Sequence, residues 1–288
     1  MDHAKIKEKL DKYGYVVVTG ILSQDEIDTA KGMFYRWQKS VPDLDRIHQK
    51  CDPHGIYKFH EVGHQPHAWE IRKNPKVQSV FRNLWGCKEL VVSFDGSCHI
   101  EKECKKKDNI WTHTDQAPNQ KGLKCYQGFV SLTSNQERTL VVYKKSHNLH
   151  EQYFKDRGIV SSKNWQLIDR DYLKSITDTK RVLNVPAGSL VLWDSRCFHQ
   201  NQYGKANSEE RIVQYVCFLP KTKEYTEAQR KKKLNYLKER RTTSHWPYPV
   251  RVNSKQPQNY GDASLTIDYD SLPVPDLDYM EEKINKII

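Results

Sequence analysis

The sequence lacks long apolar runs and lacks cysteines at ligand spacing. No segment approaches the ~18 consecutive apolar residues that a membrane-spanning helix needs, and the amino-terminal stretch MDHAKIKEKLDKYG is charged where a secretory signal is apolar. The seven cysteines are scattered, odd in number and never spaced C-x-x-C, which supports neither a disulfide framework nor a zinc knuckle. These absences predict a protein of the reducing cytoplasm with no membrane span.

Internal repeats and low-complexity tracts are also missing from the 288 residues. Hydrophobic residues make up 37% and charged residues 29%, a balance typical of globular rather than disordered chains. A chain of this length buries roughly three quarters of its unfolded surface on folding. We therefore expect one large domain over residues 1–220 and a carboxy-terminal extension over residues 221–288 that packs on the same domain.

Positive charge is concentrated in one segment. The net charge is +11, and residues 221–241 hold nine Lys or Arg against three Glu, so +6 of the total lies in this segment. Such a segment suits nucleic acid, a phosphorylated substrate or an acidic partner. However, Thr226 and Gln229 have the spacing of a capping box, and cations near a helix carboxyl end complement its dipole. The segment is therefore also predicted as a solvated helix, with Lys231, Lys232 and Lys233 facing water.

The order of apolar patterns indicates an α-rich beginning followed by many short strands. Helical periodicity covers residues 3–13, 23–40 and 74–85, and a short strand lies at 15–20. Short apolar runs bounded by turn residues follow at 89–100, 125–134, 138–147, 189–195 and 211–219. This succession is typical of a β-sandwich or barrel, here with an inserted helical stretch near 161–178.

The segment WTHTDQAP, residues 111–118, carries the first candidate site residues. A lone H-x-D is most often a pair of surface polar residues. In an extended strand, however, alternate residues share a face, so His113 and Asp115 would present an imidazole and a carboxylate to one point. His199, which follows the strand at 189–195, would complete a 2-His-1-carboxylate triad of the kind that holds Fe(II). Distant strands are neighbours in a jelly roll, so the separation is no obstacle.

Arg211 is the second element of the predicted site. It opens the strand at 211–219, and the turn-rich loop after His199 predicts that the two strands form a hairpin. In that arrangement Arg211 lies inside the barrel near His199, where a guanidinium needs a planar anion such as a carboxylate. Strand alternation adds pocket groups, which are Trp111, Trp193, Ser97 and Gln127. The histidines of FHEVGHQPH, which are His60, His64 and His67, precede the strands and are predicted to be structural or surface residues.

With these residues in place, the chain resembles the phytanoyl-CoA dioxygenase-like (PhyH) branch of the Fe(II)/2-oxoglutarate oxygenases. The resemblance is carried in order by YGYVVVTGILSQDEI, HTD, TLVVYKKSH, PAGSLVLWDSRCFHQN and NSEER, and it covers about residues 11–220. Two positions depart from the pattern of that family. Lys144 and Lys145 stand where Pro-Gly is usual, and Asn201 stands where a serine often helps bind 2-oxoglutarate.

The resemblance implies an all-β core with flanking helices, namely a cupin-like jelly roll or double-stranded β-helix with a helical preface and a carboxy-terminal extension. It implies a catalytic site in which Fe(II) is bound by His113, Asp115 and His199. The far carboxylate of the co-substrate 2-oxoglutarate would pair with Arg211, and O2 would be the oxidant. Asn201, by its place in the motif, and Gln127, by strand alternation, are assigned to cofactor binding.

The reaction implied by this resemblance is hydroxylation of a C–H bond, coupled to conversion of 2-oxoglutarate to succinate and CO2. The carboxylate of Asp115 favours hydroxylation, because iron halogenases of this class leave that position open for a halide. The net basicity suits a small anionic substrate, which the sequence does not identify. Two alternatives remain open on the same fold: a nucleic-acid-directed protein and a catalytically silent binding protein.

Overall fold

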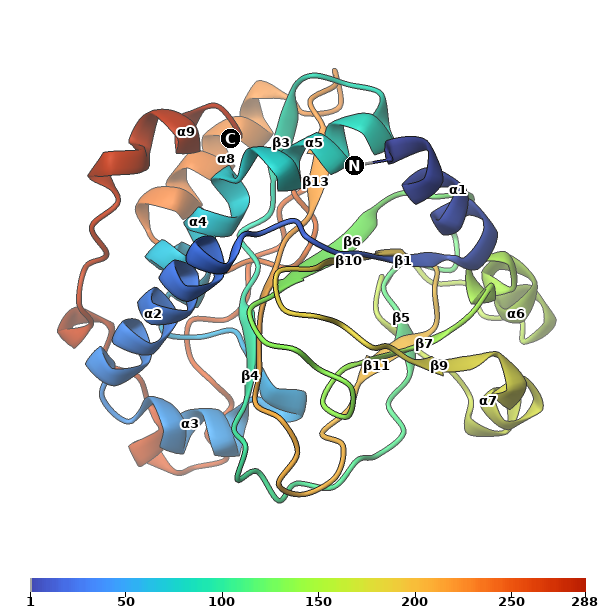
Figure 1. Ribbon diagram of the computed structural model, residues 1–288, viewed down its shortest axis with the longest axis horizontal. Helices are drawn as coiled ribbons and strands as arrows, with labels where there is room; N and C mark the ends of the chain where they lie inside the picture. The colour runs from blue at the N-terminus through green and yellow to red at the C-terminus, as the bar shows by residue number, and fades with distance from the viewer. Residues whose placement is uncertain (1) are drawn as a thin grey trace. The chain divides into compact units, whose positions relative to one another are not determined.

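The computed structural model describes residues 2–288 (Figure 1). The chain divides into two compact units. Unit 1 contains the residues up to Thr19 and Ile100–Arg211, and unit 2 contains Gly20–His99 and Ile212–Ile288. Each unit thus combines segments from distant parts of the chain. The domain boundary at residue 220 stays a prediction. Among residues 2–288, no helix has the length and apolar character needed to cross a bilayer.

Unit 1 holds a five-stranded antiparallel sheet with the strand order β8-β5-β11-β7-β9. Its strands are β8 (Gln166–Leu167), β5 (His113–Thr114), β11 (His199–Asn201), β7 (Leu140–Tyr143) and β9 (Lys180–Val182). In the register of this sheet, His199 lies opposite His113 on one side and opposite Val142 on the other. The central strand β11 is therefore flanked by β5 and β7.

A second antiparallel set in unit 1 has the order β1-β10-β6. Its strands are β1 (Tyr15–Val18), β10 (Leu190–Asp194) and β6 (Tyr126–Ser131). Trp193 of β10 pairs with Gln127 of β6 and with Tyr15 of β1. Strands that are distant in sequence alternate between the two sets, as in a double-stranded β-helix.

Helices cover one face of the five-stranded sheet in unit 1. The helices of this unit are α1 (His3–Tyr13), α6 (His150–Asp156) and α7 (Arg170–Ser175). Tyr143, Ile168 and Phe198 of the sheet region form one buried cluster with Tyr153 and Phe154 of α6 and Leu173 of α7. Because side chains alternate along a strand, the neighbours of these residues point to the other face. Phe198 therefore packs under the helices while His199 points away from them.

Unit 2 is richer in helices. They are α2 (Gln24–Ser40), α3 (Leu44–Cys51), α4 (Pro66–Lys73), α5 (Pro75–Trp85), α8 (Glu227–Lys238) and α9 (Glu281–Asn285). Its strands include β2 (Ile56–Tyr57) and the pair β3 (Leu90–Val92) and β13 (Phe218–Pro220), while β4 (Ser97–Ile100) and β12 (Arg211–Tyr215) cross the boundary between the units in sequence. The capping box of Ser23 and Glu26 begins α2, and Asn74 caps α5, as residue types at these positions predict.

The predicted hairpin between the strand of His199 and the strand of Arg211 is wrong. β11 pairs with β5 and β7, and β12 belongs to a different sheet. The loop between them is long enough to change sheets, and Glu209 anchors it by accepting hydrogen bonds from the backbone N–H groups of Gln136, Glu137 and Arg138 at 2.7–2.9 Å. The turn-rich loop therefore connects strands of two different sheets, and these strands do not pair with each other.

The helical insertion predicted near 161–178 is shorter than expected. Arg170–Ser175 forms a short α-helix there and Thr177–Thr179 a single 3₁₀ turn, whereas Gln166–Leu167 forms the edge strand β8. Burial alternates along this strand: Ile168 is buried in the cluster under α6 and α7, whereas Leu167 is exposed. This period of two is that of a strand, so tertiary pairing with β5 overrides the local helical pattern.

The turn after β7 shows how the chain accommodates its departure from the Pro-Gly pattern. Lys145 has φ +68°, in the left-handed region that glycine adopts without strain. Its N–H donates to the carbonyl of Tyr13 at 2.8 Å. The backbone thus has the conformation that a glycine would adopt at this position. Holding a lysine in it costs about 1–2 kcal/mol.

Helix α8 begins with the predicted capping box of Thr226 and Gln229, but Lys233 does not face water. It is 0% exposed, whereas Lys231 and Lys232 are exposed as expected. The Lys233 Nζ donates to the carbonyls of Val92 and Pro247 and lies 4.0 Å from the ring centroid of Phe94. These acceptors turn Lys233 into the interior of unit 2, so the helix is solvated on one side only.

Replacing Lys233 by methionine is expected to remove a pH dependence of stability. Burial lowers the pKa of Lys233 well below its usual 10.5. The unfolded chain therefore binds a proton that the folded chain lacks, so the free energy of unfolding rises with pH between the lowered pKa and about 10.5. The difference in unfolding free energy, wild type minus Lys233→Met, should increase between about pH 7 and pH 9.5 in urea titrations. The exposed control Lys232→Met should show no such increase, and equal behaviour of both variants would contradict the burial argument.

Candidate metal centre

Two histidine rings meet across the β5–β11 pair. His113 and His199 are directly opposite in register, and their ring centroids lie 4.4 Å apart. Opposed residues on neighbouring strands point to the same side of a sheet. Both rings therefore project from the face opposite to the one covered by α6 and α7.

The same local contact orients each of these rings. His113 Nδ1 lies 3.1 Å from the carbonyl oxygen of Trp111, and His199 Nδ1 lies 2.9 Å from that of Cys197. A carbonyl only accepts, so Nδ1 carries the proton in both rings and Nε2 keeps its lone pair. This is the tautomer that ligates a metal through Nε2.

Asp115 lies between the two Nε2 atoms. Its Oδ2 is 3.5 Å from His113 Nε2 and 3.3 Å from His199 Nε2. β5 ends at Thr114, and the Asp115 N–H donates to the carbonyl of Ser195 at 3.1 Å, which places the carboxylate after the strand. Gln127 Nε2 donates to Asp115 Oδ2 at 2.8 Å. Gln127 was assigned to cofactor binding from alternation, and this contact makes it a neighbour of the carboxylate.

Replacing Gln127 by methionine is expected to weaken metal binding about 10–100-fold, the usual effect of losing a hydrogen bond to a ligand. Methionine has a similar length but no N–H to hold Asp115 Oδ2 in place. Fe(II) or Mn(II) affinity would be measured by isothermal titration under anaerobic conditions. Gln127→Glu should be worse than methionine, because it places a second carboxylate against Asp115. Unchanged affinity in both variants would remove Gln127 from the metal centre.

Burial favours the neutral form of His199. The side chains of His113 and His199 are 7% and 5% exposed, and that of Asp115 is 13% exposed. Burial lowers the pKa of His199, the neighbouring His113 lowers it further, and Asp115 acts in the opposite direction. Neutral imidazole is the form that binds a metal. The ligating form of His199 is thus favoured without the metal.

The three side chains have the donor set of a metal centre. Their ligand atoms all lie within 4.8 Å of one another, and this is the one group of three or more such residues found in the described part of the chain. Two imidazoles and one carboxylate on one face suit Fe(II) with open positions. The carbonyl oxygen Oε1 of Gln127 is buried beside this group with no partner, so the site retains an unused acceptor.

Arg211 lies in unit 1 with a guanidinium that is 0% exposed. Its Nη2 donates to Asn201 Oδ1 and its Nη1 to the carbonyl of Arg138, both at 3.1 Å, and its carbon Cζ lies 5.1 Å from the ring centroid of Phe129. Nε is buried without a partner. Arg211 and Asn201 are therefore in contact, and the guanidinium keeps a donor for an anion.

A second buried guanidinium, Arg138, was missed by the sequence reasoning. Arg138 is 0% exposed, and its Nη2 donates to the carbonyls of Lys102 and Cys104 at 3.0 Å. Its Nε and Nη1 have no partner. Within residues 2–288, neither Arg138 nor Arg211 has a carboxylate in ion-pair range. Two enclosed cations without a counter-ion suit an anionic ligand, because unpaired buried charge is costly. The sequence did contain a signal for this: Arg138 lies two residues before Leu140, and alternate residues of an extended chain share a face, so Arg138 points inward with Leu140.

The remaining candidates divide between the two units. Trp111 stacks on His113 at 4.9 Å, and Trp193 lies 5.2 Å from His199, as their assignment to the pocket predicts. Ser97 instead bonds to His67 and Gln214 in unit 2. The described histidines of FHEVGHQPH are all buried there, so they are structural and not surface residues.

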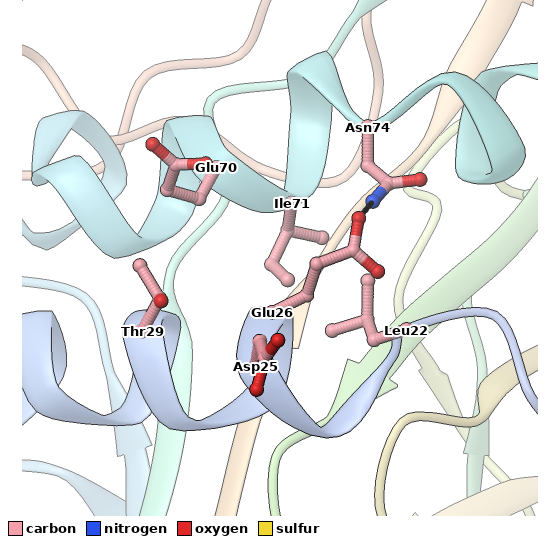
Figure 2. Close-up of a pocket in the computed structure, with 7 residues that line it drawn as sticks. All are labelled: Leu22, Asp25, Glu26, Thr29, Glu70, Ile71 and Asn74. Carbon is pink, nitrogen blue, oxygen red and sulfur yellow. Dashed lines mark hydrogen bonds between the residues drawn. The ribbon is translucent and has the colours of Figure 1, made fainter.

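A separate pocket in unit 2 contains none of these residues. Figure 2 shows it between α2 and α4. The cavity has a volume of about 240 Å³. Its polar lining is acidic, but Glu26 is already engaged by Ser23 and Asn74, and Glu70 pairs with Lys73 at 2.8 Å. Existing contacts thus account for these carboxylates.

Comparison with protein families gives a match to the phytanoyl-CoA dioxygenase (PhyH) model over residues 10–203. A curated relative is the Ava biosynthesis cluster protein O of Aspergillus versicolor, which is 30% identical over 177 residues. That match covers 57% of this chain and 57% of the relative, so it spans little more than half of either protein.

Solved structures support the fold. The GlcNAc Inducible Gene 2 protein of Candida albicans is 13% identical with a TM-score of 0.68, and the match covers 100% of this chain and 77% of that one. EctD from S. alaskensis, determined with 2-oxoglutarate and 5-hydroxyectoine, is 16% identical with a TM-score of 0.54, covering 75% of this chain and 76% of that one. These likenesses confirm the double-stranded β-helix that the family resemblance implied.

Proposed function

Because the chain belongs to the phytanoyl-CoA dioxygenase family, whose members are Fe(II)- and 2-oxoglutarate-dependent oxygenases, we propose that it hydroxylates a small-molecule substrate. In this proposal His113, Asp115 and His199 bind Fe(II), and Arg211 binds the far carboxylate of 2-oxoglutarate. The observation that carries the proposal is the convergence of two Nε2 atoms on Asp115 Oδ2, with both Nδ1 atoms bonded to backbone carbonyls.

The chemistry is shared between the bound groups and the side chains. Fe(II) and 2-oxoglutarate supply O2 activation when bound. The carbonyls of Trp111 and Cys197 hold the two imidazoles in their ligating tautomer, and Gln127 holds the carboxylate. Arg211, fixed by Asn201, offers planar donors that match a carboxylate, which sets the orientation of the co-substrate. The burial of these groups excludes water from them.

Succinate formation tests this function. Purified protein would be supplied with Fe(II), ascorbate and 2-oxoglutarate and screened against pools of small metabolites and thioesters. We expect succinate above the substrate-free rate in at least one pool, with equimolar CO2 and a product heavier by one oxygen atom. Product formation without added 2-oxoglutarate, or formation of a halogenated product, would contradict 2-oxoglutarate-dependent hydroxylation.

The identity of the substrate and the compartment are further parts of the proposal. A relative named for a biosynthesis cluster supports a small molecule as substrate. In the described chain none of the seven cysteines forms a disulfide, which supports a reducing cytoplasmic location. Fluorescence microscopy of a tagged protein would test the location.

The nucleic-acid alternative rests on the basic segment around α8. Lys233 is buried, so it does not contribute to a phosphate-binding surface. Binding to nucleic acid through several phosphates would fall steeply with salt, whereas turnover of a small neutral substrate would change little. The salt dependence of turnover therefore separates the two.

A further inference from the structure

An apolar pair lies on the edge strand beside the metal centre. β8 pairs with β5, and Leu167 is directly opposite His113. Opposed residues point to the same side of a sheet, and Trp165 lies two residues before Leu167. Trp165, Leu167 and His113 therefore share a face.

The buried cluster identifies this face independently. Ile168 and Phe198 pack with α6 and α7. Ile168 follows Leu167 in the chain, and Phe198 precedes His199. Ile168 and Phe198 both point toward the helices, so their neighbours Leu167 and His199 point to the other face of the sheet. The apolar pair thus projects on the side of the metal ligands, away from the helices.

These two side chains remain open to solvent. Trp165 is 41% exposed and Leu167 is 54% exposed. The ring centroid of Trp165 lies 5.5 Å from that of His113, and Trp111, two residues before His113, stacks on the same ring at 4.9 Å. Exposed apolar surface that adjoins a reactive centre marks a ligand-binding wall.

We propose that Trp165 and Leu167 bind an apolar part of the primary substrate, so that the site selects a neutral ring or alkyl skeleton next to the carbon that is oxidised. This inference rests on the proposed function, because it takes the metal centre as the place of reaction. An indole face and a leucine side chain offer contact area without charge, so affinity comes from removing apolar surface from water. The edge position of β8 leaves this wall accessible.

The test uses the full-length protein loaded with Mn(II) and 2-oxoglutarate, with 2-naphthol as the ring probe and 1-octanol as the chain probe. Mn(II) accelerates the proton relaxation of a nearby molecule, an effect that falls steeply with distance, so this readout needs no turnover. Mn(II) binding itself is followed by electron paramagnetic resonance. We expect Mn(II)-dependent relaxation of at least one probe.

Four variants separate the wall from general surface effects. Trp165→Ser and Leu167→Ser should each weaken the binding of that probe about five- to tenfold, since each removes roughly one apolar contact surface. Trp165→Phe should restore most of the affinity. Val182→Ser is the matched control, because Val182 is 47% exposed on β9 of the same sheet but pairs with Val141 on the helix-covered face. It should change the affinity less than about twofold.

The outcomes distinguish the two proposals. If Mn(II) binds but neither probe relaxes, or if Val182→Ser has the same effect as Leu167→Ser, the apolar wall is overturned and the metal centre stands. Tighter binding of adenosine 3′,5′-bisphosphate than of either probe would assign the wall to an anionic substrate and also overturn the inference. If Mn(II) does not bind, the proposed function fails and the inference fails with it.

Discussion

Replacing Asp115 by alanine is expected to reduce substrate-dependent succinate formation by more than about 100-fold and to weaken Fe(II) binding, while the protein stays folded. Even the loss of an outer partner of a metal ligand costs about 10–100-fold, so the loss of the anionic ligand should exceed that. Asp115 Oδ2 is the atom that lies between both Nε2 atoms. Succinate, iron content and far-ultraviolet circular dichroism would be measured on the same preparations.

The matched control for this experiment is the neighbouring Thr114. Its hydroxyl donates to the carbonyl of Ser195 at 2.9 Å, on the face away from the metal ligands. Thr114→Ser keeps that bond and should retain iron and activity. Thr114→Val removes it and should cost about 1–3 kcal/mol of stability without affecting iron binding. Full activity of Asp115→Ala, or loss of iron in Thr114→Ser, would mean that this segment is not a metal site.

Replacing Arg211 by methionine is expected to separate stability from co-substrate binding. Arg211 is an enclosed cation with no carboxylate partner in the described chain, and such a charge is expensive to bury. Methionine removes that cost but leaves two acceptors, Asn201 Oδ1 and the Arg138 carbonyl, without their donors, at about 1–3 kcal/mol each. We expect these effects to offset, leaving the unfolding free energy of the apo protein nearly unchanged or increased.

The response to 2-oxoglutarate should change far more than stability does. In the wild type, ligand at about 100 times its Kd adds about 2.7 kcal/mol to stability, and Arg211→Met should abolish this gain in thermal unfolding with saturating 2-oxoglutarate. Arg211→Lys keeps a charge but loses the planar fork, which should cost about 1.5–3 kcal/mol, or roughly 10–100-fold in affinity. Both variants should still bind Mn(II). A stabilisation by 2-oxoglutarate that survives in Arg211→Met would exclude Arg211 from the co-substrate site.

Local pattern was sufficient for much of the site because strand alternation is a local property. The spacing of His113 and Asp115 predicted that both reach one point, and the structure brings them together with His199 even though β5 ends at Thr114. The position of His199 after an apolar strand likewise indicated that it is the third ligand. In these cases the chain carries the information within a few residues.

Features that depend on pairing between distant segments were not readable in this way. The strand of Arg211 was paired with the wrong partner, because a loop sequence does not specify whether the chain returns to the same sheet. Arg138 was overlooked because a cation at the start of a strand ordinarily faces solvent, and only tertiary packing encloses it. Lys233 was misplaced for the same reason, since its carbonyl acceptors come from Val92 and Pro247.

Because Lys233 is enclosed, its chemical reactivity reports whether this part of unit 2 is intact. An amine-reactive ester modifies accessible lysines, so it should acylate Lys231 and Lys232 in the native protein and spare the residue beside them. Peptide mass spectrometry resolves such acylation by position. Reactivity at Lys233 then requires this part of unit 2 to open, and its labelling rate becomes a measure of local opening under any solution condition.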